Sequence, residues 1–113
     1  MPLIQDQVSV AAASVTDNVI AGSQYEFAPF NARVDFGLVG DTNAADLRLD
    51  VYSGSDSLCE NIQPSAQNRV PVWPDDYTLT DIVGAGERIK VRVRNVHAST
   101  ARTLFYAVRL TPV

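Results

Sequence analysis

Strict alternation between apolar and polar residues constrains this chain more than any other feature of its sequence. In "FNARVDFGLVG" one side of the alternation is apolar and consists of Phe30, Ala32, Val34, Phe36 and Leu38. Because neighbouring side chains on a strand point to opposite faces, this pattern predicts a strand that buries one face in a core. The pattern recurs over residues 46–53, 88–96 and 103–113. Strands of this kind predict an all-β protein.

Weaker strand patterns cover residues 3–10, 19–27, 69–73 and 77–83. Turn-forming stretches such as "GDTNAAD", "SGSDS", "PDD" and "GAG" lie between the strands, as an all-β domain requires. The valines of "DQVSVAAASVTDNV" favour a pair of strands, and "SDSLCENIQ" is compatible with one helical turn. About seven or eight short strands predict a two-sheet antiparallel β-sandwich with jelly-roll-like connections, while immunoglobulin-like connections stay open.

A chain of 113 residues fits one domain, so we expect residues 1–113 to form a single sandwich. With 46% hydrophobic and 19% charged residues, the composition is that of a globular protein. Residues 1–10 are expected to be an N-terminal arm or an edge strand. Both "MPLI" and "LTPV" are apolar, which suits outer strands of the sandwich or segments held by another subunit.

The single cysteine, Cys59, excludes a disulfide within the chain. The first residues lack the basic and apolar regions of a signal peptide. No run of apolar residues is long enough for a transmembrane helix. We therefore expect a protein made in the cytoplasm that has no contact with a membrane.

Charge is distributed unevenly along the chain, whose net charge is -4. Residues 86–113 carry six cations against one carboxylate, whereas residues 1–85 carry three cations against twelve carboxylates. The stretch "RIKVRVRN" places a cation at every second position, and we call Arg88, Lys90, Arg92 and Arg94 the basic row. On a strand, all of these side chains would lie on one face.

The basic row has three interpretations. A solvated strand face could pair with acids on a neighbouring strand, such as Asp35, Asp46 or Asp50. An acidic protein partner, or the acidic loops of another copy, could relieve the repulsion between the cations. Nucleic-acid binding is disfavoured because the intervening residues are aliphatic and the chain as a whole is acidic.

Trp73 and Tyr77 bracket "PDD" and form another candidate contact site. If exposed, they could stack on a sugar ring or bind a partner; if buried, they would be rim residues of the core. Pro71 and Pro74 place this segment at a sheet edge or in a loop, because proline cannot donate into a central ladder. Phe105 leaves the outer face of the last strand partly apolar and is a further candidate contact residue.

The sequence contains no catalytic signature. The single histidine, His97, lies in the loop "NVHASTAR", and Cys59 is its one conceivable partner for thiol chemistry. Neither residue has a supporting motif, so we expect a solvated loop histidine and a small half-buried cysteine. The sequence favours a protein that is not an enzyme and has no catalytic residue.

Cofactor and metal sites are not expected either. Adjacent aspartates such as those in "PDD" usually form turns. "DVYSGSDS" offers the oxygen ligands Asp50, Ser53, Ser55 and Asp56 but lacks the spacing and the terminal glutamate of an EF-hand. "GAGERI" lacks the third glycine and the following helix of a dinucleotide site. A zinc site is not expected, because the chain has too few cysteine and histidine ligands.

The chain resembles the small jelly-roll cement or decoration proteins that tailed bacteriophages place on the outside of their capsids. The resemblance covers the whole chain in size, all-β pattern and arginine-rich late strands, notably "RVPVWPDDYTLTDIVGAGERIKVRVRN" and "TARTLFYAVRLTPV". It implies a dimer or trimer that binds the lattice of the major capsid protein on the outer surface of the virion. No defining motif carries individual site residues over from the family.

The resemblance makes a partner interface the expected functional site. Its candidate residues are Trp73, Tyr77, Arg88, Lys90, Arg92, Arg94 and Phe105. Neither nucleic acid nor a membrane is an expected partner. The alternative is a carbohydrate-binding β-sandwich that uses Trp73, Tyr77 and Tyr52.

Overall fold

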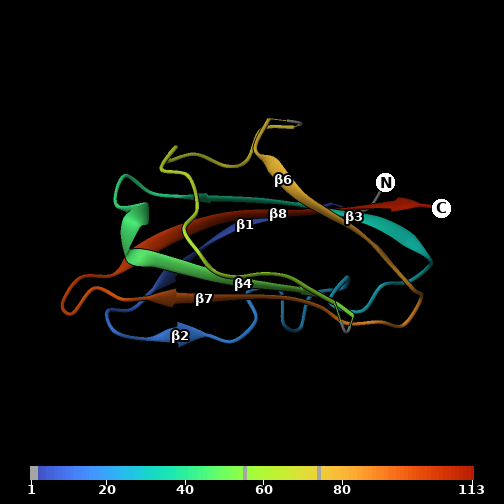
Figure 1. Ribbon diagram of the computed structural model, residues 1–113, viewed down its shortest axis with the longest axis horizontal. Coiled ribbons are helices and arrows are strands. Elements are labelled where there is room, and N and C mark those ends of the chain that lie inside the picture. The colour runs from blue at the N-terminus through green and yellow to red at the C-terminus, as the bar shows by residue number, and fades with distance from the viewer. Residues whose placement is uncertain (1–2, 55, 74) are drawn as a thin grey trace.

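The computed structural model describes residues 3–54, 56–73 and 75–113, which form a two-layer antiparallel β-sandwich (Figure 1). Sheet A has the strand order β1-β8-β3-β6, and sheet B has the order β2-β7-β4-β5. The strands are β1 (Leu3–Val10), β2 (Val15–Thr16), β3 (Ala32–Gly40), β4 (Leu47–Ser53), β5 (Asp56–Ile62), β6 (Tyr77–Val83), β7 (Ile89–Asn95) and β8 (Arg102–Pro112). The pairs β1–β8, β2–β7, β3–β6 and β4–β5 are nested within one another along the chain, which is the jelly-roll arrangement. The predicted fold class is confirmed.

One short helix interrupts the strands within the described ranges. It is the 3-10 helix η1 (Ala44–Asp46), which lies in the turn-forming stretch between β3 and β4. No helix in residues 3–54, 56–73 and 75–113 is long and apolar enough to cross a membrane.

The strand predictions hold wherever the alternation is strong. β1 and β6 match the predicted residues 3–10 and 77–83, and β3, β4, β7 and β8 match the alternating segments to within two residues at either end. Residues 6–19 contribute to two strands, as predicted, but these strands do not pair with each other: β1 pairs with β8, and β2 pairs with β7 in the other sheet. Residues 1–2 of the expected N-terminal arm lie outside the described residues.

Three further expectations fail where local turns or edge geometry decide the structure. Residues 19–27 form consecutive turns, in which the Ser23 N–H donates to the Ile20 carbonyl (3.0 Å) and Gly22 adopts φ +79°. Residues 69–73 lie in a loop. The segment with the expected helical turn is instead the edge strand β5, whose pairing with β4 shifts register twice.

The core lies between the sheets and uses the inward half of each alternation. The largest fully buried side chains are Phe36, Ile20, Leu47, Leu49, Ile89, Leu104 and Leu110. On β3 much of the outward half is buried as well: Asp35 is 7% exposed and Val39 is 0% exposed, whereas Arg33 is exposed. This strand lies between β8 and β6. The alternation therefore predicts the direction of these side chains correctly but not their burial.

A buried asparagine joins the two sheets at one end of the sandwich. The Asn95 amide Nδ2 donates to the carbonyls of Val10 (3.0 Å) and Thr100 (2.9 Å), and its Oδ1 accepts the N–H of His97 (2.9 Å). Val10 ends β1 in sheet A, and Asn95 ends β7 in sheet B. A second buried asparagine, Asn18, makes three hydrogen bonds to backbone groups at and beside the edge of β7.

Candidate functional site

The loop after β5, described over residues 63–73 and 75–76, crosses from sheet B to the outer side of sheet A, where Figure 1 shows it in yellow. The Gly40 N–H donates to the Ser65 carbonyl (2.8 Å), and the Asn68 N–H donates to the Gly40 carbonyl (3.0 Å). β6 pairs with β3 only as far as Gly37, so the loop takes over beside the last residues of β3. The end of β3 thereby positions the loop.

Small residues in sheet A let the loop approach closely. A methyl group added to Gly37 would lie 2.6 Å from Cβ of Pro71. Ala107, directly opposite Gly37 on β8, is completely buried. A larger side chain at Gly37 would push the loop away from the sheet.

Asp76 closes the loop on itself. Its Oδ2 accepts the N–H of Val72 (2.9 Å), and its own N–H donates to the Val72 carbonyl (2.9 Å). Asp76 also pairs with Arg69. The Val72 N–H, and after it Arg69, hold the pKa of the Asp76 carboxyl below its usual range.

The loop presents Trp73 at the surface beside two partners. The rings of Trp73 and Tyr77 meet edge to face, with centroids 5.0 Å apart, and the Arg109 guanidinium lies 4.0 Å from the Trp73 ring centroid. Trp73 nevertheless stays 44% exposed. Leu3 and Gln5 of β1 border a hollow of about 320 Å³ beside these side chains. We call Leu3, Gln5, Trp73, Tyr77 and Arg109 the Trp73 patch.

The environment of Tyr77 differs from that of Trp73. Burial raises the pKa of the Tyr77 phenol, while the nearby Arg109 works in the opposite direction. The sequence left open whether this aromatic pair is exposed or buried. Trp73 is exposed, whereas Tyr77 is partly buried. The two prolines predicted a sheet edge or a loop. Pro71 lies in the loop, and Pro74 lies outside the described residues.

The other aromatic candidates lie elsewhere. Phe105 is half-buried on the outer face of sheet A, opposite Gln7 on β1 and Val39 on β3. Tyr52 lies on β4 in sheet B, with Nζ of Lys90 5.8 Å from its ring centroid. The expected trio of Tyr52 with Trp73 and Tyr77 is therefore not brought together.

Half of the basic row is neutralised within the chain. Nε of Arg88 lies 2.8 Å from Oε2 of Glu26, and Nζ of Lys90 lies 3.2 Å from Oδ1 of Asp17. The N–H of Gly22, and after it Arg88, lower the pKa of Glu26. These two cations lie against the turn-rich segment that precedes β3.

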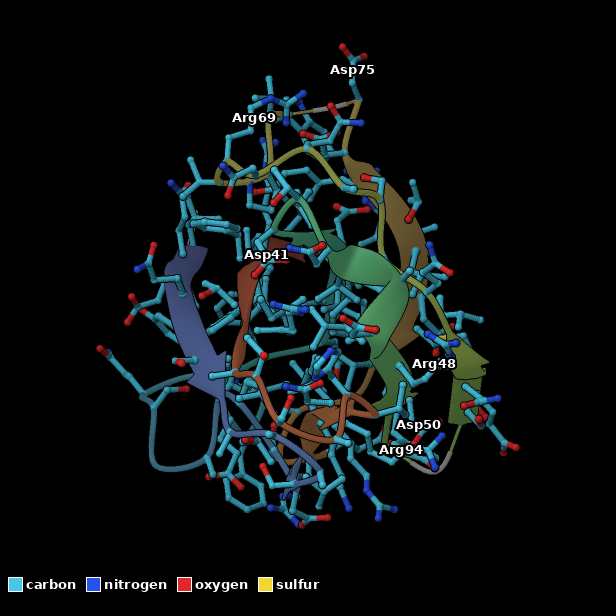
Figure 2. The ribbon with its side chains drawn as sticks, turned by 90° about the vertical axis from the view of Figure 1, so that its left-hand side faces the viewer. Asp41, Arg48, Asp50, Arg69, Asp75 and Arg94 are labelled. Carbon is cyan, nitrogen blue, oxygen red and sulfur yellow. The ribbon has the colours of Figure 1, made fainter. Side chains whose placement is uncertain are left out.

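The acids expected to face the basic row mostly bind elsewhere. Asp35 pairs with Arg33 (3.2 Å), and Asp46 pairs with Arg102 (2.8 Å). Asp50 does lie directly opposite Arg92, with β4 and β7 side by side. Arg94 lies opposite another cation, Arg48, and Figure 2 shows both near Asp50.

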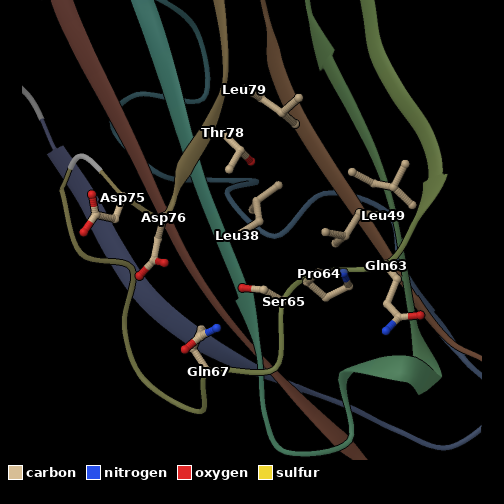
Figure 3. Close-up of a pocket in the computed structure, with 11 residues that line it drawn as sticks. Leu38, Leu49, Gln63, Pro64, Ser65, Gln67, Asp75, Asp76, Thr78 and Leu79 are labelled. Carbon is tan, nitrogen blue, oxygen red and sulfur yellow. The ribbon is translucent and has the colours of Figure 1, made fainter.

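A second hollow, of about 410 Å³, opens where the loop leaves sheet B (Figure 3). Leu38, Leu49 and Leu79 give it apolar walls, and the loop adds polar side chains such as Gln63, Ser65 and Gln67. Its titratable residues, Asp75 and Asp76, are neighbours in the chain. The Asp76 carboxylate already accepts the Val72 N–H and pairs with Arg69. This lining lacks the pair of facing acid and base groups that acid–base catalysis uses.

The structure keeps Cys59 and His97 apart. Cys59 lies opposite Val51 on β4, and Val51 lies opposite Val91 on β7. His97 follows Val91 in the chain, beyond the end of β7, and the rise per residue of a strand places it roughly 20 Å from Val91. Burial raises the pKa of the Cys59 thiol, which disfavours the reactive thiolate. Nδ1 of His97 accepts the N–H groups of Ser99 (3.1 Å) and Thr100 (3.0 Å). His97 therefore orders its own loop.

The oxygen-rich stretch at the end of β4 does not assemble a metal site among the described residues. Asp50 points outward, whereas Ser53 is buried on the inner face at 2% exposure. Ser55 lies outside the described residues. Within the described ranges, no group of three or more His, Cys, Asp or Glu side chains gathers as metal ligands would.

Comparison of the chain with protein-family models, with curated proteins and with solved structures finds no match.

Proposed function

We propose that this protein is a non-enzymatic structural protein that binds the outside of a viral capsid and reinforces it, like the cement proteins of tailed bacteriophages. The Trp73 patch carries the proposal, because it combines a 44% exposed tryptophan with Tyr77 and Arg109 at van der Waals range. Tryptophan, tyrosine and arginine are the residue types that dominate binding energy at protein interfaces. A protein surface that covers Trp73 and fills the adjoining hollow would suit this arrangement.

The dimensions of the molecule support a contact through one sheet. Figure 1 is viewed down the shortest axis and shows the two sheets one above the other, so the face of one sheet spans the extents of 42 and 21 Å and offers roughly 900 Å². One partner in a standard protein interface contributes about 800 Å². The outer face of sheet A, which also carries Phe105, is large enough to serve as such a contact.

The proposed mechanism is thermodynamic. A protein that binds only the assembled lattice stabilises that state by mass action, and many copies per shell multiply the effect. A dimer or trimer, formed where capsid subunits meet, is part of the proposal. Arg92 and Arg94 would then contact acidic groups of the shell or of a sister copy.

The test uses particles of the virus that encodes this chain, purified with and without it. We expect the wild-type chain on the particles, a higher temperature of genome release in its presence, and loss of binding in Trp73→Ala. Tyr52→Ala is the matched control, because it removes an aromatic ring from the opposite sheet. Absence of the chain from the particles, or equal binding of both variants, would refute the proposal. Light scattering after size exclusion, over a range of salt, gives the oligomeric state.

A carbohydrate-binding module is the second candidate. It is favoured by the edge-to-face pair of Trp73 and Tyr77, which borders a hollow that Gln5 also lines. Aromatic faces with a few polar groups are typical of small-molecule sites. Saturable quenching of the single tryptophan's fluorescence by a glycan, lost in Gln5→Ala, would favour this candidate over the capsid proposal.

A further inference from the structure

The outer face of sheet B gathers three arginines that form no ion pair with a carboxylate among the described residues. Ion pairs engage Arg33, Arg69, Arg88, Lys90 and Arg102, and Arg109 lies on the Trp73 ring. In the described part of the chain, no carboxylate oxygen lies within 4.0 Å of a charged nitrogen of Arg48, Arg92 or Arg94. All of these three, which we call the arginine trio, lie on the neighbouring strands β4 and β7.

The pairing of β4 with β7 brings like charges together. Arg48 lies directly opposite Arg94, an arrangement that destabilises an isolated sheet. Asp50 lies opposite Arg92, but its Oδ1 already accepts the N–H of Asn61 (2.7 Å). The cluster keeps an excess of positive charge, and Figure 2 shows Arg48, Asp50 and Arg94 grouped away from Arg69 and Asp75.

Hydrogen bonds hold two of these guanidinium groups in place. Nη1 of Arg48 donates to the Leu47 carbonyl (2.9 Å), and Nη2 of Arg94 donates to Oδ1 of Asn61. Nε of Arg92 and Nε of Arg94 are buried and lack a hydrogen-bond partner within the described residues. Because these two Nε atoms have almost no accessible surface, a ligand would reach the guanidinium groups through their Nη nitrogens, and a planar guanidinium matches a carboxylate in geometry.

An apolar hollow adjoins the arginine trio. It has a volume of about 350 Å³ and is lined by Arg94 together with Val15 and Val96. Val15 is 43% exposed and Val96 is 53% exposed. A ligand that places a carboxylate on Arg94 could therefore bury an adjacent apolar side chain here.

We infer that the arginine trio binds carboxylates of an acidic protein segment, and that the hollow takes an apolar side chain of the same segment. The inference rests on the proposed function, in which the segment belongs to the capsid. Nucleic acid fits less well, because a long phosphate chain would meet the acidic remainder of a chain with net charge -4.

The experiment is an NMR titration of the isotope-labelled protein with an acetylated oligoglutamate peptide that contains one leucine. We expect the side-chain Nε–H signals of Arg92 and Arg94 to move, with that of Arg33 unchanged. The double variant Arg48→Gln/Arg94→Gln should bind roughly tenfold more weakly. Its matched control, Arg33→Gln/Arg88→Gln, also removes two cations and should lose about twofold at most. Unchanged backbone spectra far from the substitutions establish that both variants are folded.

Two further probes distinguish the ligands. Inorganic phosphate and a short single-stranded DNA, each at the same concentration of negative charge as the peptide, should move the Nε–H signals of Arg92 and Arg94 less than the peptide does. Equal or larger shifts would overturn the inference that this site binds carboxylates. No shift with the peptide would also overturn it. If the peptide fails while particles still bind the chain through Trp73, the proposed function survives and only this inference falls. Peptide binding without any particle binding would leave the site but refute the capsid role.

Discussion

The two outer faces of the sandwich are built on the same alternation but have opposite chemistry. On sheet A, the small residues Gly37 and Ala107 lie beneath a loop that presents an aromatic side chain. On sheet B, half-exposed long side chains such as Arg48 and Arg92 stand directly on the strands. The inner faces must both be apolar because they share one core, whereas the outer faces are free to differ.

The difference predicts two kinds of contact. Binding through the Trp73 patch depends on apolar area and ring contacts, which salt affects weakly. Binding through the arginine trio depends on partly exposed charges, which salt screens within about 8 Å at physiological ionic strength. The salt dependence of any complex would therefore indicate which face is involved.

The largest effect is expected from breaking the join between the two sheets at Asn95. Asn95→Ala removes three hydrogen bonds and leaves the buried carbonyl of Val10 without this donor. We expect the free energy of unfolding to fall by about 3 kcal/mol, measured by urea denaturation. Asn43→Ala, in an exposed turn, is the control and should change it by less than about 0.5 kcal/mol. Equal effects of both substitutions would contradict this role of Asn95.

Gly37→Ala tests whether close packing holds the loop on sheet A. The added methyl would lie 2.6 Å from Cβ of Pro71, so the loop must shift. We expect a loss of about 2 kcal/mol in unfolding free energy and a changed Trp73 emission spectrum. Adding Pro71→Gly removes the opposing atom and should recover part of the loss. A spectrum identical to wild type in Gly37→Ala would show that the loop does not depend on this contact.

Arg94→Glu sharpens the contrast on sheet B. It replaces a like-charge pair with an opposite-charge pair across from Arg48. We expect a gain of about 0.5 kcal/mol in unfolding free energy, with loss of binding to the acidic peptide. Arg33→Glu should instead destabilise, because it reverses an ion pair with Asp35. Destabilisation by Arg94→Glu would mean that Arg94 stabilises the folded protein itself, which would contradict the expected repulsion between Arg94 and Arg48.

The smallest effect is expected from acid on the loop of sheet A. The folded-state pKa of Asp76 is lowered, chiefly by the Val72 N–H, so its stabilisation is present above the unfolded pKa and is lost as pH falls through the folded one. We expect the Trp73 emission to change below about pH 4 while the sandwich stays folded. Asp76→Asn should abolish this response. Persistence of the response in that variant would assign it to another acid.

How much the sequence predicts depends on whether a feature is local. The alternation of β4 predicts both its strand and its buried face, because each depends only on neighbouring residues. β5 escapes detection because it is an edge strand in which register shifts disturb the period, leaving most of its residues exposed. Turns, rather than a strand, then place Glu26 against Arg88.

The candidate site is predictable only in part for the same reason. The sequence indicates Trp73 and Tyr77 as a pair and places Arg109 on the outer side of β8. It does not reveal that the loop crosses sheet A and brings Trp73 onto Arg109, because that path depends on which strands are neighbours. Arg48 joins Arg94 through strand pairing in the same way.

The pairing of β1 with β8 has a mechanical consequence. Leu3 lies opposite Arg109, close to the end of the last strand, and the register between β1 and β8 runs without a shift to Val10. A force that separates the two ends of the chain would load these backbone hydrogen bonds one after another, as in opening a zipper. A force applied across the broad faces would instead meet many contacts at once. A partner that binds the broad faces would therefore load the fold where it resists force best, whereas a partner that pulls on β1 and β8 would load it where it resists force least.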